Sequence, residues 1–230
     1  LGSNKNSSLF MDLVSRRAAG EPISHIISSR AFWKNDFYID ETVLDPRPES
    51  ELIIDITKDL LFDGMRVLDL GCGSGCIGIS LYKENPNISL FLADSSKQAI
   101  RISKKNAAEL KTECELIHSF LFANISGKFD LIVTNLPYIS KGDFFFLQKE
   151  IILYEPHEAL YGGVSGLDAI KLFLRDVGRY LNKNGVFVIE FGKGQDVLLK
   201  KELLKVNFDN FEFHKDFNQV KRLVCVKKDT

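Results

Sequence analysis

The sequence predicts an α/β fold built on a doubly wound sheet that is mostly parallel and ends in an antiparallel hairpin. Three observations lead to this prediction. From residue 66 onward, short apolar runs that suit buried strands alternate with longer helix-like stretches. A glycine-rich turn, residues 71–75, directly follows the first of these runs. The last two runs are joined through residues 216–219, which is too short a connection for a helical crossover, so antiparallel pairing is expected.

The composition is that of an ordinary globular protein and argues against several classes. The 230 residues are 45% hydrophobic and 27% charged, and the formal net charge of −1 creates no strong overall field for nucleic acid. No apolar run approaches the length of about eighteen residues that a membrane helix needs, and no signal peptide opens the chain. We therefore expect a cytoplasmic protein, and we expect a monomer. The four cysteines form no Cys-x-x-Cys pair, so no metal site is expected.

The first 45 residues are predicted to differ from the main domain. Residues 1–20, polar at first and helix-like over 10–19, are interpreted as a linker or as the remnant of an N-terminal helical region. Residues 21–45 are interpreted as a β-hairpin connection, because apolar residues recur in loose alternation from Ile23 to Val43 and read as a strand pair.

A polar, proline-rich segment, residues 45–51, opens the main domain and leads into a predicted helix over 51–61. This segment carries three charged residues, Arg47, Glu49 and Glu51. We give equal weight to two interpretations of them. They form a solvated loop and helix start, where acids suit the helix dipole, or they form a clamp that closes over a ligand.

The rest of the chain supplies the strands and helices of the sheet. The predicted strands cover residues 66–70, 89–93, 115–118, 129–134, 185–191, 211–214 and 223–226. The predicted helices cover residues 76–84, 96–110, 166–181 and 195–204, and Ser96 is expected to cap the second of them.

The glycine-rich turn is the first feature that carries chemistry. It consists of Gly71, Cys72, Gly73, Ser74 and Gly75. Glycines let a ligand approach the main chain closely, and Asp94, 23 residues after Gly71, is near the spacing at which an acid binds ribose hydroxyls. An adenosine-containing cofactor is therefore expected. Two registers remain open: residues 73–78 match the dinucleotide fingerprint, and residues 69–75 match the first motif of S-adenosylmethionine enzymes.

The second chemical feature is Asn135-Leu136-Pro137-Tyr138, which follows the predicted strand at residues 129–134. The Asn135 side chain offers an acceptor, and the Leu136 carbonyl offers another beside it. Two convergent acceptors can hold both hydrogens of a substrate NH2 group, while the Tyr138 ring can pack against a planar group. The competing interpretation is a turn that only ends a strand.

Together these features favour methyl transfer. Asp69 within the preceding strand, the terminal hairpin and the Asn135 turn all argue for an S-adenosylmethionine enzyme. A non-catalytic cofactor-binding protein or an NAD-dependent protein is the alternative, and cofactor titration would separate the two.

The chain resembles the PrmC/HemK family, the glutamine-N5 methyltransferases that modify peptide-chain release factors. The matching stretches are residues 16–26, 46–52, 67–77, 135–139 and 155–168. The last stretch is the most specific, because motifs of the Asn/Asp-Pro-Pro-Tyr type also occur in DNA and rRNA adenine methyltransferases and this one does not.

The resemblance implies a class I S-adenosylmethionine-dependent methyltransferase, Rossmann-like, with residues 46–230 as its catalytic domain. It implies S-adenosyl-L-methionine as the cofactor and class I release factors as partners, with methyl transfer to the glutamine of their Gly-Gly-Gln motif. Nucleic acid is expected only through the ribosome-associated partner, and a nucleic-acid adenine-N6 methyltransferase is the alternative.

The resemblance also implies roles for individual residues. The implied catalytic residues are Asn135, Leu136, Pro137 and Tyr138, which would grip the substrate amide. The implied cofactor-binding residues are Gly71, Cys72, Gly73, Ser74, Gly75, Asp94, Phe120 beside the adenine, and Asn135. His157, within the last matching stretch, either braces the Asn135 loop or only packs.

The sequence departs from the family in three places. Leu136 stands where the family usually has proline, which keeps the backbone acceptor but loses the rigidity of the ring. Ser119 stands where an aspartate near the adenine is common. Most of the family's N-terminal helical domain, which recognises the release factor, is expected to lie outside the sequence before Phe10.

Overall fold

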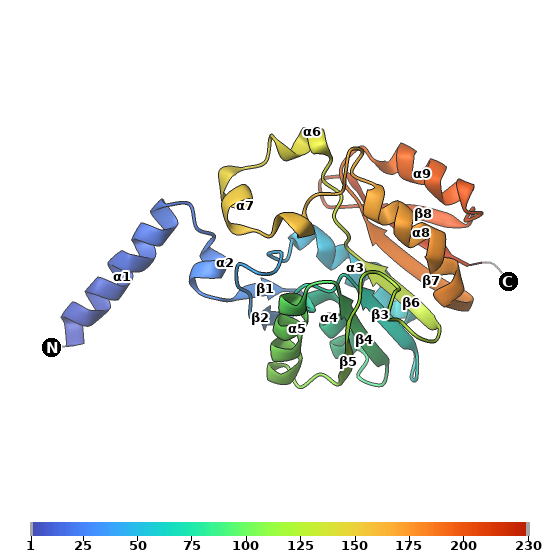
Figure 1. The fold of residues 1–230 in the computed structure, drawn as a ribbon. Helices are drawn as coiled ribbons and strands as arrows, with labels where there is room; N and C mark the ends of the chain where they lie inside the picture. Colours follow the sequence, from blue (N-terminus) through green and yellow to red (C-terminus); the bar gives the residue numbers. More distant parts are fainter. Residues whose placement is uncertain (1, 229–230) are drawn as a thin grey trace.

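The computed structural model describes residues 2–228, with side chains from residue 8 onward. Figure 1 shows one large sheet with helices on both faces, and helix α1 (Gly2–Ala18) extending away from it. Between them lie a short helix and a small hairpin. Within the described residues, no helix is both long and apolar enough to cross a membrane.

The main sheet has seven strands in the order β5-β4-β3-β6-β7-β9-β8. Their bounds are β3 (Arg66–Leu70), β4 (Ser89–Asp94), β5 (Cys114–His118), β6 (Phe129–Thr134), β7 (Leu181–Glu190), β8 (Phe211–Lys215) and β9 (Lys221–Lys227). The first five strands in this order pair in parallel, while β9 pairs antiparallel with both β7 and β8. The predicted fold class, terminal hairpin included, is confirmed.

Helices cover both faces of this sheet because its strands alternate their side chains between two cores. One face packs against α3 (Glu51–Thr57), α4 (Cys76–Glu84) and α5 (Lys97–Glu109). The other packs against α8 (Asp168–Tyr180) and α9 (Asp196–Lys205). A buried aliphatic or aromatic side chain in such a core stabilises the fold by about 1.5–3 kcal/mol.

The prediction of a strand pair from Ile23 to Val43 is wrong for its first residues. Residues Ile23–Ile26 form a helical turn, α2, in which the N–H groups of His25 and Ile26 both donate to the carbonyl of Pro22. The apolar residues Ile23, Ile26 and Ile27 are spaced by three and four, which is a helical spacing and not the spacing of a strand. The hairpin that does form is short, with β1 (Arg30–Phe32) paired to β2 (Asn35–Phe37).

Short helical pieces that the sequence did not predict fill the region between β6 and α8. They are α6 (Lys141–Phe144), α7 (Lys149–Tyr154) and the 3-10 turn η3 (His157–Ala159). Similar turns flank α3, namely η1 (Pro48–Ser50) and η2 (Lys58–Leu60), so the helix expected over 51–61 ends early. Helices of one or two turns are too short to show a hydrophobic period. In the view of Figure 1, α6 and α7 lie above the sheet.

Candidate active site

A pocket lies at the carboxyl ends of the central strands. The sheet order reverses between β3 and β6, and in open α/β sheets ligands bind at such a switch point. Gly71 follows β3, Asp94 ends β4 and Asn135 follows β6, so the three converge on this pocket. Residues 42–47 and 156–159 complete its walls from outside the sheet.

The glycine-rich turn forms one wall and leaves space for a ligand. A Cβ atom at Gly73 would meet nothing within 4 Å, so the backbone there is open to contact from the pocket side. At Gly78, a Cβ would lie 2.5 Å from Leu92 Cδ2, so α4 packs this closely on β4 only because the residue is glycine. That is the role of the third glycine in nucleotide-binding turns.

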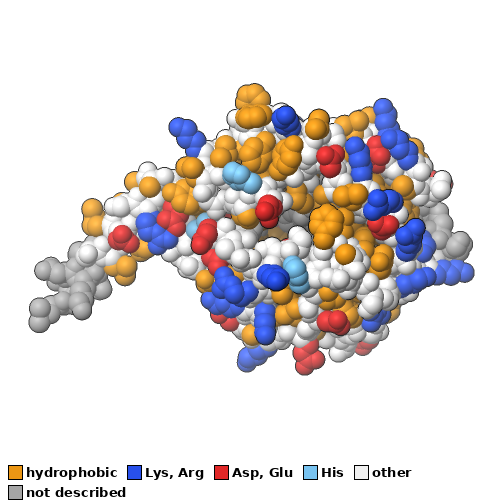
Figure 2. Space-filling model, viewed as in Figure 1, with side chains coloured by type: hydrophobic (Ala, Val, Ile, Leu, Met, Phe, Trp, Pro, Cys, Tyr) orange, Lys and Arg blue, Asp and Glu red, His pale blue; other side chains and the backbone are white. Residues whose placement is uncertain are grey.

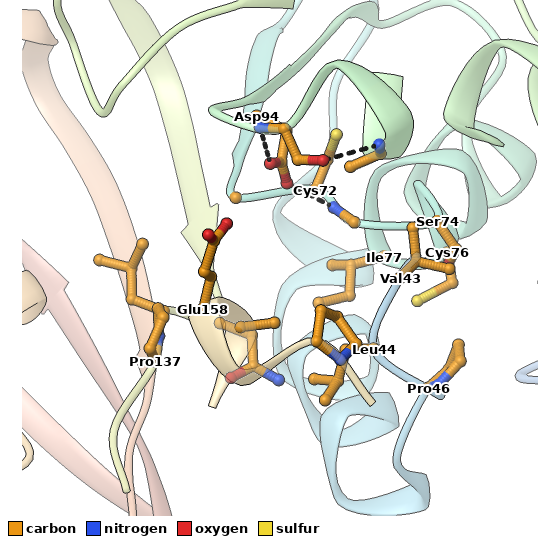
Figure 3. A pocket seen from close by; sticks show the side chains of 18 of the residues that line it. Val43, Leu44, Pro46, Cys72, Ser74, Cys76, Ile77, Asp94, Pro137 and Glu158 are labelled. Atoms are coloured by element: carbon orange, nitrogen blue, oxygen red, sulfur yellow. Dashed lines mark hydrogen bonds between the residues drawn. The ribbon is translucent and has the colours of Figure 1, made fainter. Parts of the chain in front are cut away.

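Asp94 lies on the pocket wall with both carboxylate oxygens anchored. Its Oδ2 accepts the Gly73 N–H at 2.9 Å and its Oδ1 accepts the Ser96 N–H at 2.8 Å. Figure 3 shows these bonds, with Glu158 and Pro137 on the other side of the pocket. Burial raises the pKa of Asp94, although the backbone N–H groups act against this shift. Each carboxylate oxygen has a further lone pair, so Asp94 can still accept from ligand hydroxyls.

The Asn135 loop forms the opposite wall. Thr134 Oγ1 donates to the Leu70 carbonyl at 2.6 Å, which joins β6 to β3 where the pocket opens. The Leu136 side chain is buried beside the glycine-rich turn, where a Cβ at Gly71 would lie 3.4 Å from Leu136 Cδ2. Leucine therefore fills space between the two loops, which is a packing role that the sequence did not reveal.

Tyr138 faces an adjoining cavity and not the main pocket. That cavity also contacts Asn135, Arg47 and Leu160. The Tyr138 hydroxyl donates to Glu190 Oε1 at 3.1 Å, and burial raises the pKa of the phenol. Tyr138 is therefore a hydrogen-bonding support of the loop in this structure.

The stretch 155–168 packs its backbone directly against the Asn135 loop. A Cβ at Gly162 would lie 2.6 Å from the Pro137 carbonyl oxygen and 2.8 Å from Tyr138 Cα. Backbone hydrogen bonds link Ile139 N–H to Leu160 O at 3.0 Å and Gly162 N–H to Ile139 O at 2.9 Å. The glycines of this stretch are thus needed for close contact with the loop that carries the candidate catalytic residues.

Arg47 links the two segments that lie outside the sheet. Its Nη2 lies 2.6 Å from both carboxylate oxygens of Glu155, whose side chain is almost fully buried. This ion pair joins the proline-rich segment to the stretch 155–168 beside the pocket, as the clamp interpretation requires. Glu51, in contrast, accepts the Trp33 N–H at 2.8 Å and supports the hairpin.

Two residues near Asn135 were missed by the sequence reasoning. Asn135 Nδ2 donates to Ser50 Oγ at 3.1 Å, and Ser50 Oγ donates to Glu190 Oε2 at 2.6 Å. Glu190 ends β7 and is 1% exposed, and burial raises its pKa. An acid inside an otherwise apolar strand was the signal that could have identified it.

Other candidates lie away from the pocket or serve the packing. Phe120 is 65% exposed and is not part of the pocket wall. The Ser119 hydroxyl donates to Leu121 O and accepts from Asn124 N–H within its own turn. His157 packs edge-on against Phe144, with ring centroids 5.3 Å apart, which agrees with the packing interpretation.

The cysteines show no sign of catalytic chemistry. Burial raises the pKa of Cys76 to about 12 and raises that of Cys72, so both remain thiols at neutral pH. Over the part of the chain that the structure describes, no group of three His, Cys, Asp or Glu side chains is arranged to hold a metal ion.

The chain is similar to known methyltransferases in sequence and in fold. The family model described as Methyltransferase small domain matches residues 48–163. The release factor glutamine methyltransferase of Koribacter versatilis (strain Ellin345) is 34% identical over 223 residues, covering 95% of this chain and 79% of that protein. That of Rhodospirillum rubrum is 37% identical, covering 80% of this chain and 57% of that protein. The solved T. thermophilus 16S rRNA N2 G1207 methyltransferase, in complex with AdoMet and guanosine, shares the fold with a TM-score of 0.63 at 18% identity, over 87% of this chain and 49% of that one.

Proposed function

The chain belongs to the family of release factor glutamine methyltransferases, and on that premise we propose that it methylates the side-chain amide nitrogen of the Gly-Gly-Gln glutamine in a class I release factor. The observation that carries this proposal is the place of Asn135 and the Leu136 carbonyl. They lie at a strand end directly beside the glycine-rich turn, so an amide held by them would lie next to a cofactor held by the turn.

The residues of the pocket fit S-adenosyl-L-methionine. The open backbone at Gly73 permits close approach of a ligand, and Asp94 can accept hydrogen bonds from ribose hydroxyls. The residues proposed to hold it are Gly71, Cys72, Gly73, Ser74, Gly75, Asp94 and Asn135, with Phe120 near the adenine. Asp94 and Glu158 add negative charge to the walls, which suits a ligand that carries a sulfonium and an ammonium group. When bound, this cofactor supplies an activated methyl group.

The task of the protein is to orient the amide. An amide nitrogen is a poor nucleophile because its lone pair is delocalised into the carbonyl group. Asn135 Oδ1 and the Leu136 carbonyl would accept its two N–H bonds and aim the nitrogen at the methyl group. The same acceptors stabilise the positive charge that develops on the nitrogen, so the interaction is stronger in the transition state than in the ground state.

A surface groove beside the pocket supports a protein substrate. It is formed by Lys141, Phe144, Phe145, His157, Glu158 and Tyr161, and Glu158 also lines the main pocket. Phe145 and Phe146 are 76% and 88% exposed, and hydrophobic side chains gather on this side in Figure 2. Aromatic rings also stack on bases, but single-stranded nucleic acid needs a basic track for its phosphates. The groove offers one lysine and one glutamate, which favours a partly apolar peptide loop.

We assign the regions of the chain on the same basis. Residues 46–230 form the catalytic domain, since they contain the seven-stranded sheet and most of the pocket, to which Thr42, Val43 and Leu44 also contribute. Residues 21–45 form a connection that holds the β1–β2 hairpin, and the stretch before it holds helix α1 (Gly2–Ala18).

Mass spectrometry tests the proposed function. Incubation with S-adenosylmethionine and a full-length class I release factor should add one methyl group to the glutamine of Gly-Gly-Gln. An Asn135→Ala variant serves as the control for contaminating activity. Methyl transfer to ribosomal RNA or DNA, with none to the release factor under the same conditions, would establish the adenine alternative instead.

A further inference from the structure

Four side chains at the Asn135 wall of the pocket form one continuous hydrogen-bond chain, and two of them, Asn135 and Ser50, line the pocket. Asn135 Nδ2 donates to Ser50 Oγ at 3.1 Å, and Ser50 Oγ donates to Glu190 Oε2 at 2.6 Å. From the other side, the Tyr138 hydroxyl donates to Glu190 Oε1 at 3.1 Å. Ser50 and Glu190 are 2% and 1% exposed, so water does not substitute for these partners.

The direction of this chain follows from the chemistry of its members. An ionised carboxylate accepts hydrogen bonds and donates none. The Ser50 hydroxyl must therefore donate its single hydrogen to Glu190. Toward Asn135 it can then only accept a hydrogen bond, through an oxygen lone pair. The group of Asn135 that can donate to this Ser50 lone pair is its side-chain NH2 group. Its carbonyl oxygen is consequently directed to the other side, where Asn135 lines the pocket.

Burial, and after it the nearby charge of Glu49, raises the pKa of Glu190, and three neighbours act against this rise. The hydroxyls of Ser50 and Tyr138 both donate to it, and the nearby charge of Arg222 also favours the ionised form. A neutral side chain of the same shape would not impose a direction, because it could donate to Ser50 as well as accept from it.

We propose that Glu190 and Ser50 are positioning residues that determine which end of the Asn135 amide faces the substrate. By keeping the oxygen toward the pocket, they make the site select a substrate NH2 group over a carbonyl group. This inference rests on the proposed function and deepens it, since it names the residues that set the polarity of the amide site.

Glu190→Gln is the direct kinetic test, because it keeps the size of the side chain and removes its charge, and with the charge the fixed direction of the hydrogen bonds. The glutamine NH2 can donate to Ser50, whose hydrogen is then free for the Asn135 oxygen, so a share of molecules turns the Asn135 NH2 toward the substrate. We expect kcat for release factor methylation to fall roughly 10- to 100-fold, which is less than the roughly 100- to 1000-fold for complete loss of one oriented polar group, because only a share of the molecules is misoriented. Affinity for S-adenosylmethionine, measured by calorimetry, should change far less than kcat, because the glycine-rich turn and Asp94 are untouched.

Matched variants separate this role from a general structural effect. Glu115→Gln removes the same charge from an exposed position on β5 and should leave kcat unchanged. Tyr138→Phe removes one bond to Glu190 but leaves the Ser50 branch intact, so it should cost less in kcat than Glu190→Gln. Equal losses in kcat for Tyr138→Phe and Glu190→Gln, or a wild-type kcat in Glu190→Gln, would overturn the proposal.

A measurement without substrate keeps this inference separate from the proposed function. In ¹⁵N-labelled wild-type protein, the side-chain NH2 of Asn135 should exchange slowly with solvent, because Ser50 holds it. Its signal is identified by its loss in Asn135→Ala. In Glu190→Gln the exchange should become faster or the signal should split. Unchanged exchange in Glu190→Gln would refute the positioning role, whatever the wild-type enzyme methylates. A wild-type protein inactive on release factor, with the exchange effect present, would refute the substrate assignment alone.

Discussion

Asn135 and Asp94 are the two residues on which the proposed function most depends, and both side chains are held by hydrogen bonds to their neighbours. Asp94 is anchored by two backbone N–H groups, and Asn135 is anchored through Ser50. Such pre-organisation lowers the cost of aligning these groups when substrate binds.

For Asn135, removal of the side chain should affect the chemical step more than binding. Asn135→Ala should lower kcat by roughly 100-fold or more, because the lost acceptor acts mainly in the transition state. Cofactor affinity should change far less than kcat, since the glycine-rich turn and Asp94 keep their contacts with the cofactor. Steady-state kinetics with release factor and calorimetry with S-adenosylhomocysteine measure the two effects. A variant as active as the wild type would mean that residues 135–138 only end a strand.

For Asp94, removal of the carboxylate should affect binding of the cofactor. Asp94→Ala should weaken S-adenosylmethionine binding by about 1.5–3 kcal/mol, the scale of a hydrogen bond to a charged group. Asp209→Ala, at an exposed position, is the matched control. Calorimetry that shows equal affinities for the two variants, or tight binding of NAD, would contradict the assignment of this pocket.

At the scale of elements, the candidate site depends on a loop that is packed from behind. The stretch 155–168 contacts the Asn135 loop through backbone atoms, and the Arg47–Glu155 ion pair joins that stretch to the segment before α3. The Asn135 loop is thus held between β6 and a segment that follows it in sequence, and its shape depends on both.

Gly162→Ala tests this packing. The added methyl would meet the Pro137 carbonyl and Tyr138 Cα at distances that require the loop to move. We expect a loss of about 1–3 kcal/mol in the free energy of unfolding and a fall in kcat. Gly142→Ala, where the added atom would lie 3.7 Å from Ser140 Oγ, should change neither. Denaturant melts measure the free energy of unfolding of both variants, and steady-state kinetics measure their kcat. Equal values for the two variants would exclude a packing role for Gly162.

At the scale of the whole molecule, one buried acid makes stability depend on pH. Asp69 is fully buried in β3, its Oδ2 accepts the Gly78 N–H at 2.8 Å, and its Oδ1 has no partner among the described residues. Burial first, with the nearby charge of Asp94 adding to it, raises the pKa of Asp69 from 3.8 to about 7. Between these two values the folded protein keeps a proton that the unfolded chain has released.

The free energy of unfolding should therefore fall as pH rises from about 4 to about 7, and this contribution should level off above that range. The full effect of Asp69 is on the order of 4 kcal/mol. Asp69→Asn should remove this part of the slope, while contributions from other buried acids are common to both proteins and cancel. Urea melts at several pH values measure the difference. Parallel curves for the wild type and the variant would show that Asp69 does not titrate in this range.

The sequence by itself determined the family, the succession of strands and helices along the chain and the three strand ends that form the pocket. The family assignment from the stretches around residues 135–139 and 155–168 is confirmed by the relatives. The bounds predicted for α4 and β6 agree with the structure to the residue. These features were predictable because hydrophobic period, glycine turns and prolines are properties of neighbouring residues.

Only the tertiary structure decided how the site is supported. Ser50 and Glu190 are 140 residues apart, and Ser50 and Asn135 are 85 residues apart, so no local pattern links them. No local pattern predicts the packing of Leu136 on Gly71 or of Gly162 on Pro137 either. The same is true of the hydrogen bond from Tyr138 to Glu190. Contacts of this kind arise when distant segments fold onto one sheet edge, and a single sequence records the residues but not which of them meet.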